Sequence, residues 1–168
     1  LDWNDRSTCG LFGDGAGALL LRAEAQSGEV ADRGILATRL CADGRHYGDL
    51  YVDGGPSTTG TAGHLRMNGR EVFRHAVVDL AAVAEQVLGD CGLTPAALDL
   101  LVPHQANRRI IEAVGKRLDL PAEKVVITVA RHANTGITDL DLDGACVQLF
   151  HIVAHFILQL GQALAFRI

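Results

Sequence analysis

The spacing of apolar residues changes along the chain, and each spacing predicts a different kind of element. From Glu71 to Gly92, apolar side chains recur every three or four positions, which is the period of one face of an α-helix. Gly92 follows this stripe, where a glycine commonly ends a helix. The pattern predicts one long amphipathic helix, whose stripe is Val72, Phe73, Ala76, Val77, Leu80, Val83, Ala84, Val87 and Leu88.

A shorter helix is predicted after Pro103. Proline cannot donate to a sheet ladder, so the apolar run at residues 98–102 is expected to end there as a strand, and His104 to begin a loop. Beyond the loop, aliphatic residues fall at helical spacing and basic residues occupy the remaining faces. The unit is therefore strand, loop and helix, and the aliphatic positions of the helix are Ile110, Ile111, Val114 and Leu118.

Further short apolar runs predict strands at residues 9–12, 18–21, 34–40 and 125–129. Residues 43–63 are rich in Gly, Thr and Asp and show no period, so we expect a long surface loop. Thr94 and Pro95 are expected to open a short helical turn before the strand at 98–102.

The apolar stretch near the C-terminus, residues 146–166, resembles a membrane span in composition only. Five polar residues interrupt it, so a buried helix or a pair of strands is expected instead. His151 and His155 have the spacing of two metal ligands on a helix, but no His-Glu-x-x-His motif accompanies them, and we predict no metal site. The interrupting residues are Gln148, His151, His155, Gln159 and Gln162.

Composition indicates a compact globular domain. The 168 residues are 48% hydrophobic, enough for one substantial core, and the net charge of −5 gives no reason to expect a nucleic-acid partner. No charged-then-apolar signal segment opens the chain. The cysteines do not form a Cys-x-x-Cys metal motif and are too few for a disulfide scaffold, so free thiols in a reducing cytoplasm are expected at Cys9, Cys41, Cys91 and Cys146.

The glycine-rich residues 13–17 admit two interpretations. Such a turn cradles a phosphate when a helix N-terminus follows it, but the next residues, 18–21, are strand-like. A tight hairpin with close backbone packing is therefore favoured over a phosphate-binding loop.

Two polar residues lie near the ends of apolar runs and suggest one site. His104 follows residues 98–102, and Asn134 follows residues 125–129, so both are expected at neighbouring strand ends, where open α/β sheets place their ligands. An imidazole and a carboxamide offer two neutral donors to one oxygen, which suits stabilisation of a thioester enolate or oxyanion. Taken singly, either residue has an ordinary structural interpretation, His104 as a helix cap and Asn134 in a turn.

The motifs around these residues resemble a known family. Pro-His-Gln-Ala-Asn-Arg-Arg-Ile at 103–110 and Arg-His-Ala-Asn-Thr at 131–135 are preceded by Asn-Gly-Arg-Glu-Val-Phe at 68–73, Phe-Gly-Asp-Gly-Ala-Gly-Ala at 12–18 and Asp-Arg-Ser-Thr at 5–8. In this order and spacing they resemble the C-terminal half of the ketoacyl synthase III family, the acyl carrier protein condensing enzymes of the thiolase superfamily. The resemblance implies an α/β, thiolase-like half-domain over residues 1–168, with a mixed sheet and covering helices.

The resemblance also implies a reaction and a set of roles. A short acyl-CoA and malonyl-acyl carrier protein would condense to 3-oxoacyl-acyl carrier protein, with His104 and Asn134 holding the malonyl thioester oxygen. Such enzymes are cytoplasmic homodimers without a permanently bound cofactor and act away from membranes and nucleic acid. By carry-over, Arg6 and Arg109 would line the pantetheine entrance, with Phe73, Ala76 and Asn107 along its wall. Acyl carrier protein would meet Arg74, Lys116 and Arg117, which pattern alone describes as a solvated helix face.

Two departures from the family keep alternatives open. The family's nucleophilic cysteine belongs to an N-terminal half that has no counterpart here, and residues 136–168 lack the family's small-residue helix and glycine-rich loop. The competing interpretations are a non-catalytic fragment or binding module for coenzyme A and acyl carrier protein, and a related condensing enzyme with another acyl donor.

Overall fold

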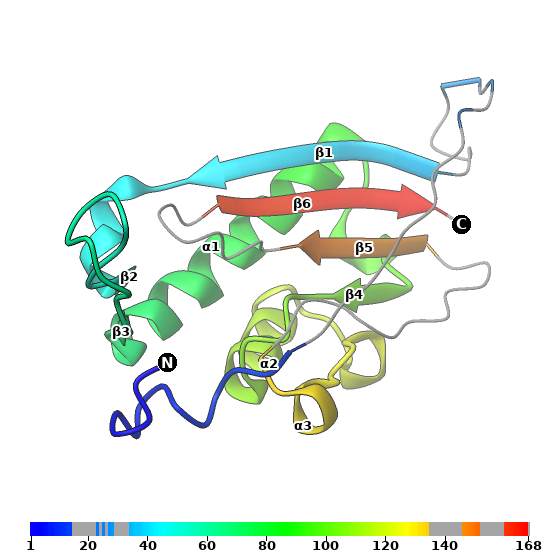
Figure 1. The fold of residues 1–168 in the computed structure, drawn as a ribbon. Helices are drawn as coiled ribbons and strands as arrows, with labels where there is room; N and C mark the ends of the chain where they lie inside the picture. Colours follow the sequence, from blue (N-terminus) through cyan, green and yellow to red (C-terminus); the bar gives the residue numbers. More distant parts are fainter. Residues whose placement is uncertain are drawn as a thin grey trace.

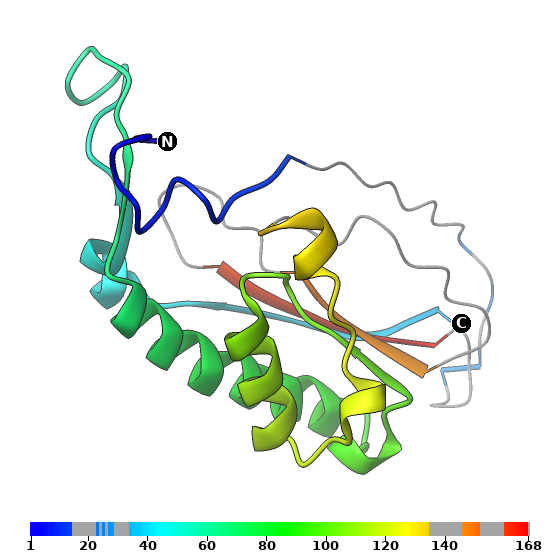
Figure 2. The same ribbon diagram turned by 90° about the horizontal axis from the view of Figure 1, so that it is seen from below.

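A computed structural model of the protein describes residues 1–14, 23, 25, 27–28, 34–134, 146–151 and 160–167. Its framework is a four-stranded sheet with helices along one face (Figures 1 and 2). The strands lie in the order β1 (Gly34–Ala42), β6 (Leu160–Arg167), β5 (Cys146–His151) and β4 (Leu100–Val102).

The sheet is mixed. β6 runs antiparallel to both β1 and β5, with Gly34 and Cys146 opposite Arg167, whereas β4 runs parallel to β5, with Leu100 opposite Val147. The predicted mixed sheet with covering helices is therefore confirmed. Of the two alternatives expected for the C-terminal apolar stretch, a buried helix or a pair of strands, the structure shows two strands, β5 and β6, and β1 extends the strand predicted at residues 34–40 by two residues.

The long helix α1 (Gly69–Asp90) forms where the apolar stripe predicts it. Glu71 places a negative charge in the first turn, which favours the positive end of the helix dipole. At the other end, Gly92 adopts φ +67°. The N–H of Leu93 bonds to the carbonyl of Leu88 at 2.9 Å and that of Gly92 to Gly89 at 3.0 Å, a Schellman cap. Gly92 therefore ends the helix as predicted.

The second helix, α2 (Arg108–Arg117), begins and ends at identifiable caps. The side-chain oxygen of Asn107 accepts the N–H of Ile110 at 3.0 Å, an N-cap that satisfies one of the unpaired donors of the first turn. Asp119, at φ +54°, turns the chain after the helix, and the N–H of Leu120 bonds to Gly115 at 2.9 Å.

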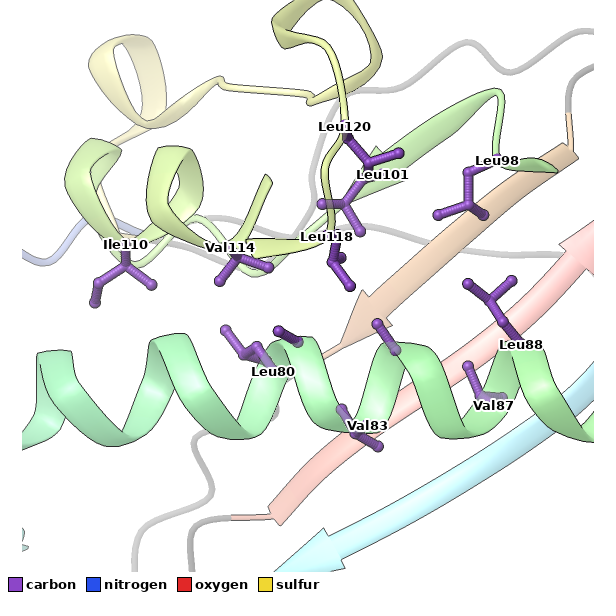
Figure 3. Packing of buried hydrophobic residues seen from close by; sticks show 12 residues of the cluster. Leu80, Val83, Val87, Leu88, Leu98, Leu101, Ile110, Val114, Leu118 and Leu120 are labelled. Carbon is purple, nitrogen blue, oxygen red and sulfur yellow. The ribbon is translucent and has the colours of Figure 1, made fainter. Parts of the chain in front are cut away.

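The hydrophobic core lies between α1, α2 and the chain around β4. Leu80 of α1 points toward Ile110 and Val114 of α2, and Leu88 toward Leu98 (Figure 3). Burying each such side chain contributes about 1.5–3 kcal/mol to folding. This packing fixes the position of α2, and with it the loop that carries His104.

Residues 43–63 are more ordered than predicted. Asp43 accepts the N–H of Arg45 at 3.0 Å and caps a 3-10 helix, η1 (Gly44–Asp49). The strands β2 (Leu50–Val52) and β3 (Leu65–Met67) then pair antiparallel. The expected long loop is wrong because strands of three residues are too short to show a period of two.

The strand predicted at residues 9–12 is also wrong. The backbone carbonyl of Asp5 accepts the N–H groups of Thr8 and Cys9 at 3.2 and 3.0 Å, so this segment turns, and Phe12 alone forms a bridge. The strand predicted at 18–21 falls outside the described residues, as does the hairpin expected for residues 13–17.

At residues 125–129 the predicted strand is reduced to one bridge between Val125 and Leu101. A 3-10 turn, η3 (Ala122–Lys124), precedes it and a four-residue helix, α3 (Val129–His132), follows. The predicted turn before β4 is confirmed as η2 (Pro95–Ala97). Of the helices in the described residues, none combines the length and apolar character that crossing a membrane requires.

Candidate active site

His104 begins the loop that follows β4, as its sequence position predicts. Pro103 is buried, His104 is half-buried, and the N–H of Ala106 bonds to the His104 carbonyl at 2.9 Å. This tight turn delivers the chain directly to Asn107, the N-cap of α2. The histidine is thus held between a strand end and a capped helix, both packed on the core.

Asn134 reaches the site by another route than the one predicted. It follows α3 and Ala133, which adopts φ +56°, rather than a strand. The N–H of Asn134 donates to the Leu11 carbonyl at 2.9 Å, and its carbonyl accepts the Gly13 N–H at 3.3 Å. The backbone of Asn134 is therefore anchored to the N-terminal segment, alongside Phe12.

Gln105 connects the two segments, and the sequence interpretation overlooked it. Its side chain is 1% exposed. The amide nitrogen donates to the carbonyls of Pro103 at 2.9 Å and Val126 at 3.2 Å. The amide oxygen accepts the N–H groups of Thr128 at 2.7 Å and Val129 at 3.0 Å. The signal in the sequence is a glutamine directly after His104, in the loop that follows an apolar strand.

A pocket of about 670 Å³ opens beside these segments. It lies between the N-terminal turns of α1 and α2 and the N-terminal segment of the chain. The residues that line it include three of the predicted site residues, Phe73, Asn107 and Arg109, together with Leu11, Gly69, Arg70 and Arg108, which were not predicted.

The pocket walls carry positive charge. The Arg109 guanidinium lies over the Phe73 ring, 5.2 Å from its centroid, within the range of a cation–π contact. Arg108 is paired with Glu112 at 2.8 Å. For Arg70 and Arg109 the described part of the chain provides no carboxylate partner. These two guanidinium groups therefore leave the pocket suited to an anionic ligand.

The other predicted site residues lie outside this lining. Arg6 is exposed in the N-terminal segment, and Ala76 packs against the core cluster. Arg74 forms an ion pair with Glu71 at 2.8 Å. Lys116 and Arg117 are exposed in the last turn of α2, where positive charge favours the helix dipole. Their assigned roles remain predictions.

The aspartate of the Asp-Arg-Ser-Thr motif, Asp5, stabilises the turn that the motif forms. The Asp5 carboxylate accepts the Ser7 hydroxyl at 2.6 Å and the hydroxyl of buried Thr8 at 3.0 Å. The Ser7 hydrogen bonds hold the pKa of Asp5 below its usual value. An ionised Asp5 therefore fixes the turn that leads to Leu11 and Phe12.

One further group of side chains has the composition of a metal site. His46, Asp49 and His75 place potential ligand atoms within 4.8 Å of one another. The imidazole rings of His46 and His75 also contact each other, with centroids 3.5 Å apart and a tilt of 40°. The close contact of the two tilted rings joins η1 to α1.

Comparison with known proteins places these motifs in one family. Residues 1–44 match the family model of 3-oxoacyl-[acyl-carrier-protein] synthase III, and residues 88–142 match that of its C-terminal part. Relatives named beta-ketoacyl-[acyl-carrier-protein] synthase III, from Rhizorhabdus wittichii and Sphingopyxis alaskensis, are 62% and 63% identical over 142 and 143 residues. Each alignment covers 84% of this chain and 43% of the relative, so the chain spans less than half the length of these curated relatives.

The fold agrees with the sequence. The crystal structure of 3-oxoacyl-(acyl carrier protein) synthase III from Pseudomonas aeruginosa matches with a TM-score of 0.83 and 34% identity, covering 99% of this chain and 53% of that chain. The enzyme of the same name from Aquifex aeolicus matches with a TM-score of 0.78 and 30% identity, covering 99% of this chain and 53% of that chain. The thiolase-like half-domain predicted from the motifs is thus confirmed, and the chain belongs to the 3-oxoacyl-[acyl-carrier-protein] synthase III family.

Proposed function

We propose that this chain supplies the His and Asn half of an active site that condenses a short acyl-CoA with malonyl-acyl carrier protein. The observation that supports the proposal is that one pocket is lined by residues next to both donors. Leu11, in the pocket wall, accepts the backbone N–H of Asn134, and Asn107, in the same wall, lies three residues beyond His104. The product is 3-oxoacyl-acyl carrier protein, and the reaction initiates fatty acid synthesis.

The chemistry assigned to the pair is stabilisation of an enolate. The bond between the α-carbon and the carboxylate of the malonyl group breaks, carbon dioxide leaves, and the bonding electrons move onto the α-carbon and the thioester oxygen. His104 and Asn134 donate hydrogen bonds to that oxygen as its charge develops. The α-carbon then attacks the carbonyl of an acyl-cysteine, forming the new carbon–carbon bond and releasing the thiolate.

The pocket suits the pantetheine arm and the phosphates of the substrates. Phe73 and Asn107 provide an apolar and a polar wall, and the guanidinium groups of Arg70 and Arg109 attract negative charge. Acyl carrier protein is acidic in this family, and Lys116 and Arg117 present exposed positive charge in the last turn of α2. We further infer a cytoplasmic homodimer, in which the nucleophilic cysteine comes from sequence that this chain does not contain.

The proposal is tested in the full-length polypeptide by substitution of the two donors. His104→Ala and Asn134→Ala are each expected to slow malonyl-carrier protein decarboxylation by about two to three orders of magnitude, the usual effect of removing one oxyanion donor. Transfer of the acyl group to the cysteine should change less, because that step does not form the malonyl enolate.

His64→Ala is the matched control, because His64 is an exposed histidine distant in sequence from both motifs. It should keep the activity of the unmodified protein. Decarboxylation at the normal rate in both His104→Ala and Asn134→Ala would remove the pair from the mechanism.

A further inference from the structure

The Gln105 carboxamide is fully bonded inside the protein. A carboxamide offers two N–H donors and an oxygen with two lone pairs. Here the donors meet Pro103 and Val126, and the oxygen meets Thr128 and Val129. Because the side chain is 1% exposed, each of these bonds replaces one to water that burial removed.

The four partners belong to two segments that carry the two donors of the site. Pro103 directly follows strand β4 and precedes His104. Val126, Thr128 and Val129 lie on the path into α3, and Asn134 follows that helix by two residues. One side chain therefore spans the gap between the His104 loop and the segment leading to Asn134.

The Gln105 oxygen also organises the start of α3. Thr128 is the N-cap residue and its side chain makes no capping bond, so the first N–H groups of the helix need another acceptor. The Gln105 oxygen accepts two of them, from Thr128 and Val129. The start of α3 is thus held in place by a side chain of the His104 loop.

We propose that Gln105 is a positioning residue that fixes the spacing between His104 and Asn134. Two donors stabilise one developing oxyanion only when both remain within about 0.5 Å of the productive geometry. Gln105 holds the segments that carry them, with bonds on both sides and no exposure to competing water. This role rests on the proposed condensation reaction, and the test below separates the two.

The decisive variant is Gln105→Glu, made in the full-length polypeptide. Glutamate has nearly the same shape and keeps the oxygen that accepts from Thr128 and Val129. Its second oxygen replaces the amide nitrogen and faces the carbonyls of Pro103 and Val126. When ionised it repels them; when protonated it donates to one of them. Burial and the two carbonyls raise the pKa of the introduced carboxyl above its usual value. The carboxyl should therefore become protonated at moderately acidic pH, where the activity of the variant can be measured.

We expect Gln105→Glu to lower kcat for malonyl-carrier protein decarboxylation about ten- to a hundredfold at pH 8, the scale of a displacement near 1 Å. KM for the malonyl substrate and the rate of cysteine acylation should change less than threefold. The deficit relative to the unmodified protein should shrink as pH falls, because protonation restores a donor to the clamp.

Val87→Ala is the control for a purely structural effect, because Val87 is fully buried on α1 and makes none of the Gln105 bonds. It should lower the melting temperature without a pH-dependent loss of decarboxylation. A Gln105→Glu enzyme with a normal kcat, or with a loss that is independent of pH and follows the melting temperature as in Val87→Ala, would overturn the positioning role. An unmodified protein without decarboxylase activity would instead overturn the proposed function.

Discussion

Arg109 and Phe73 join the first turns of α2 and α1 across the mouth of the pocket. The guanidinium carbon lies 5.2 Å from the ring centroid, and both residues line the pocket wall. Within the described residues the N–H groups of the Arg109 side chain make no hydrogen bond, so they are available to a ligand. The contact thereby holds a positive charge, without a carboxylate partner in the described residues, at a defined place in the pocket.

Phe73→Leu tests this contact, because leucine keeps apolar bulk but has no π face. A cation–π contact at a partly exposed site contributes about 0.5–1 kcal/mol, so KM for acyl-CoA should rise about two- to fivefold while kcat is retained. The measurement is acyl-transfer kinetics in the full-length polypeptide. Val78→Ala, an exposed site on the same helix, should leave KM unchanged. An unaltered KM in Phe73→Leu would show that Arg109 is held by other means.

Reversing the charges of Lys116 and Arg117 to glutamate should weaken binding of acyl carrier protein mainly through slower association. Long-range attraction acts on the association rate and is screened by salt, so the difference should shrink as ionic strength rises. Surface plasmon resonance at several salt concentrations measures this. Arg45→Glu changes an exposed arginine on η1 and serves as the control. Equal association rates at low salt would indicate that the α2 surface is only solvated.

The elements that the sequence predicted well have either a long periodic pattern or a residue that clearly marks where the element ends. The α1 stripe repeats over six turns and ends at a glycine that the cap requires, and Pro103 marks the end of β4. By contrast, residues 125–129 are as apolar as a strand, yet Val125 alone pairs with Leu101. Beyond it, the Gln105 oxygen draws the N–H groups of Thr128 and Val129 away from any sheet ladder, and this interaction comes from outside the segment.

The candidate site shows the same difference between residues that a local pattern predicts and residues that depend on distant contacts. His104 could be placed from its proline and its helix, which are local. The anchoring of Asn134 to Leu11 depends on residues more than a hundred positions apart, and no local pattern reveals it. Arg70 was overlooked for a similar reason, because only the packing of α1 beside α2 brings the start of one helix to the start of the other.

The ion pair between Arg39 and Asp90 predicts a specific pH dependence of stability. Arg39 on β1 bonds through Nε and Nη2 to both carboxylate oxygens of Asp90 at the end of α1. This hydrogen bonding holds the pKa of Asp90 below its ordinary value. A lowered folded-state pKa gives stability that is present above the unfolded pKa of about 4 and is lost as pH falls through the folded pKa.

Asp90→Asn should therefore lower the melting temperature slightly at pH 7, and the difference from the unmodified protein should begin to shrink as pH falls below about 4 and continue to shrink through the lowered folded-state pKa of Asp90. Thermal unfolding of both proteins between pH 7 and pH 3 measures it. Comparing the melting temperatures of the two proteins separates the effect of Asp90 from that of the other carboxylates that titrate in this range. A difference that stays constant down to pH 3 would show that the pair does not act through its charge.

Gly115 of α2 lies so close to Val125, in the segment that leads to α3, that a side chain at position 115 would clash. A Cβ at Gly115 would lie 2.8 Å from Cγ2 of Val125. Val125 has little freedom to retreat, because its χ1 is restricted and the adjacent N–H of Val126 is bonded to the Leu101 carbonyl at 2.9 Å. Replacing a glycine inside a helix by alanine normally gains about 1 kcal/mol, and overpacking normally costs about 1–3 kcal/mol.

The overpacking should outweigh the helix propensity, so Gly115→Ala is expected to destabilise the protein by about 1 kcal/mol. In a Val125→Ala background the clash is absent, and the same substitution should become stabilising. Denaturant unfolding of both single variants and the double variant completes the cycle, with a coupling energy above about 0.5 kcal/mol expected for residues in contact. Stabilisation by Gly115→Ala alone would mean that Val125 can move aside. The segment that leads through Thr128 to Asn134 would then be held by the Gln105 bonds rather than by its packing on α2.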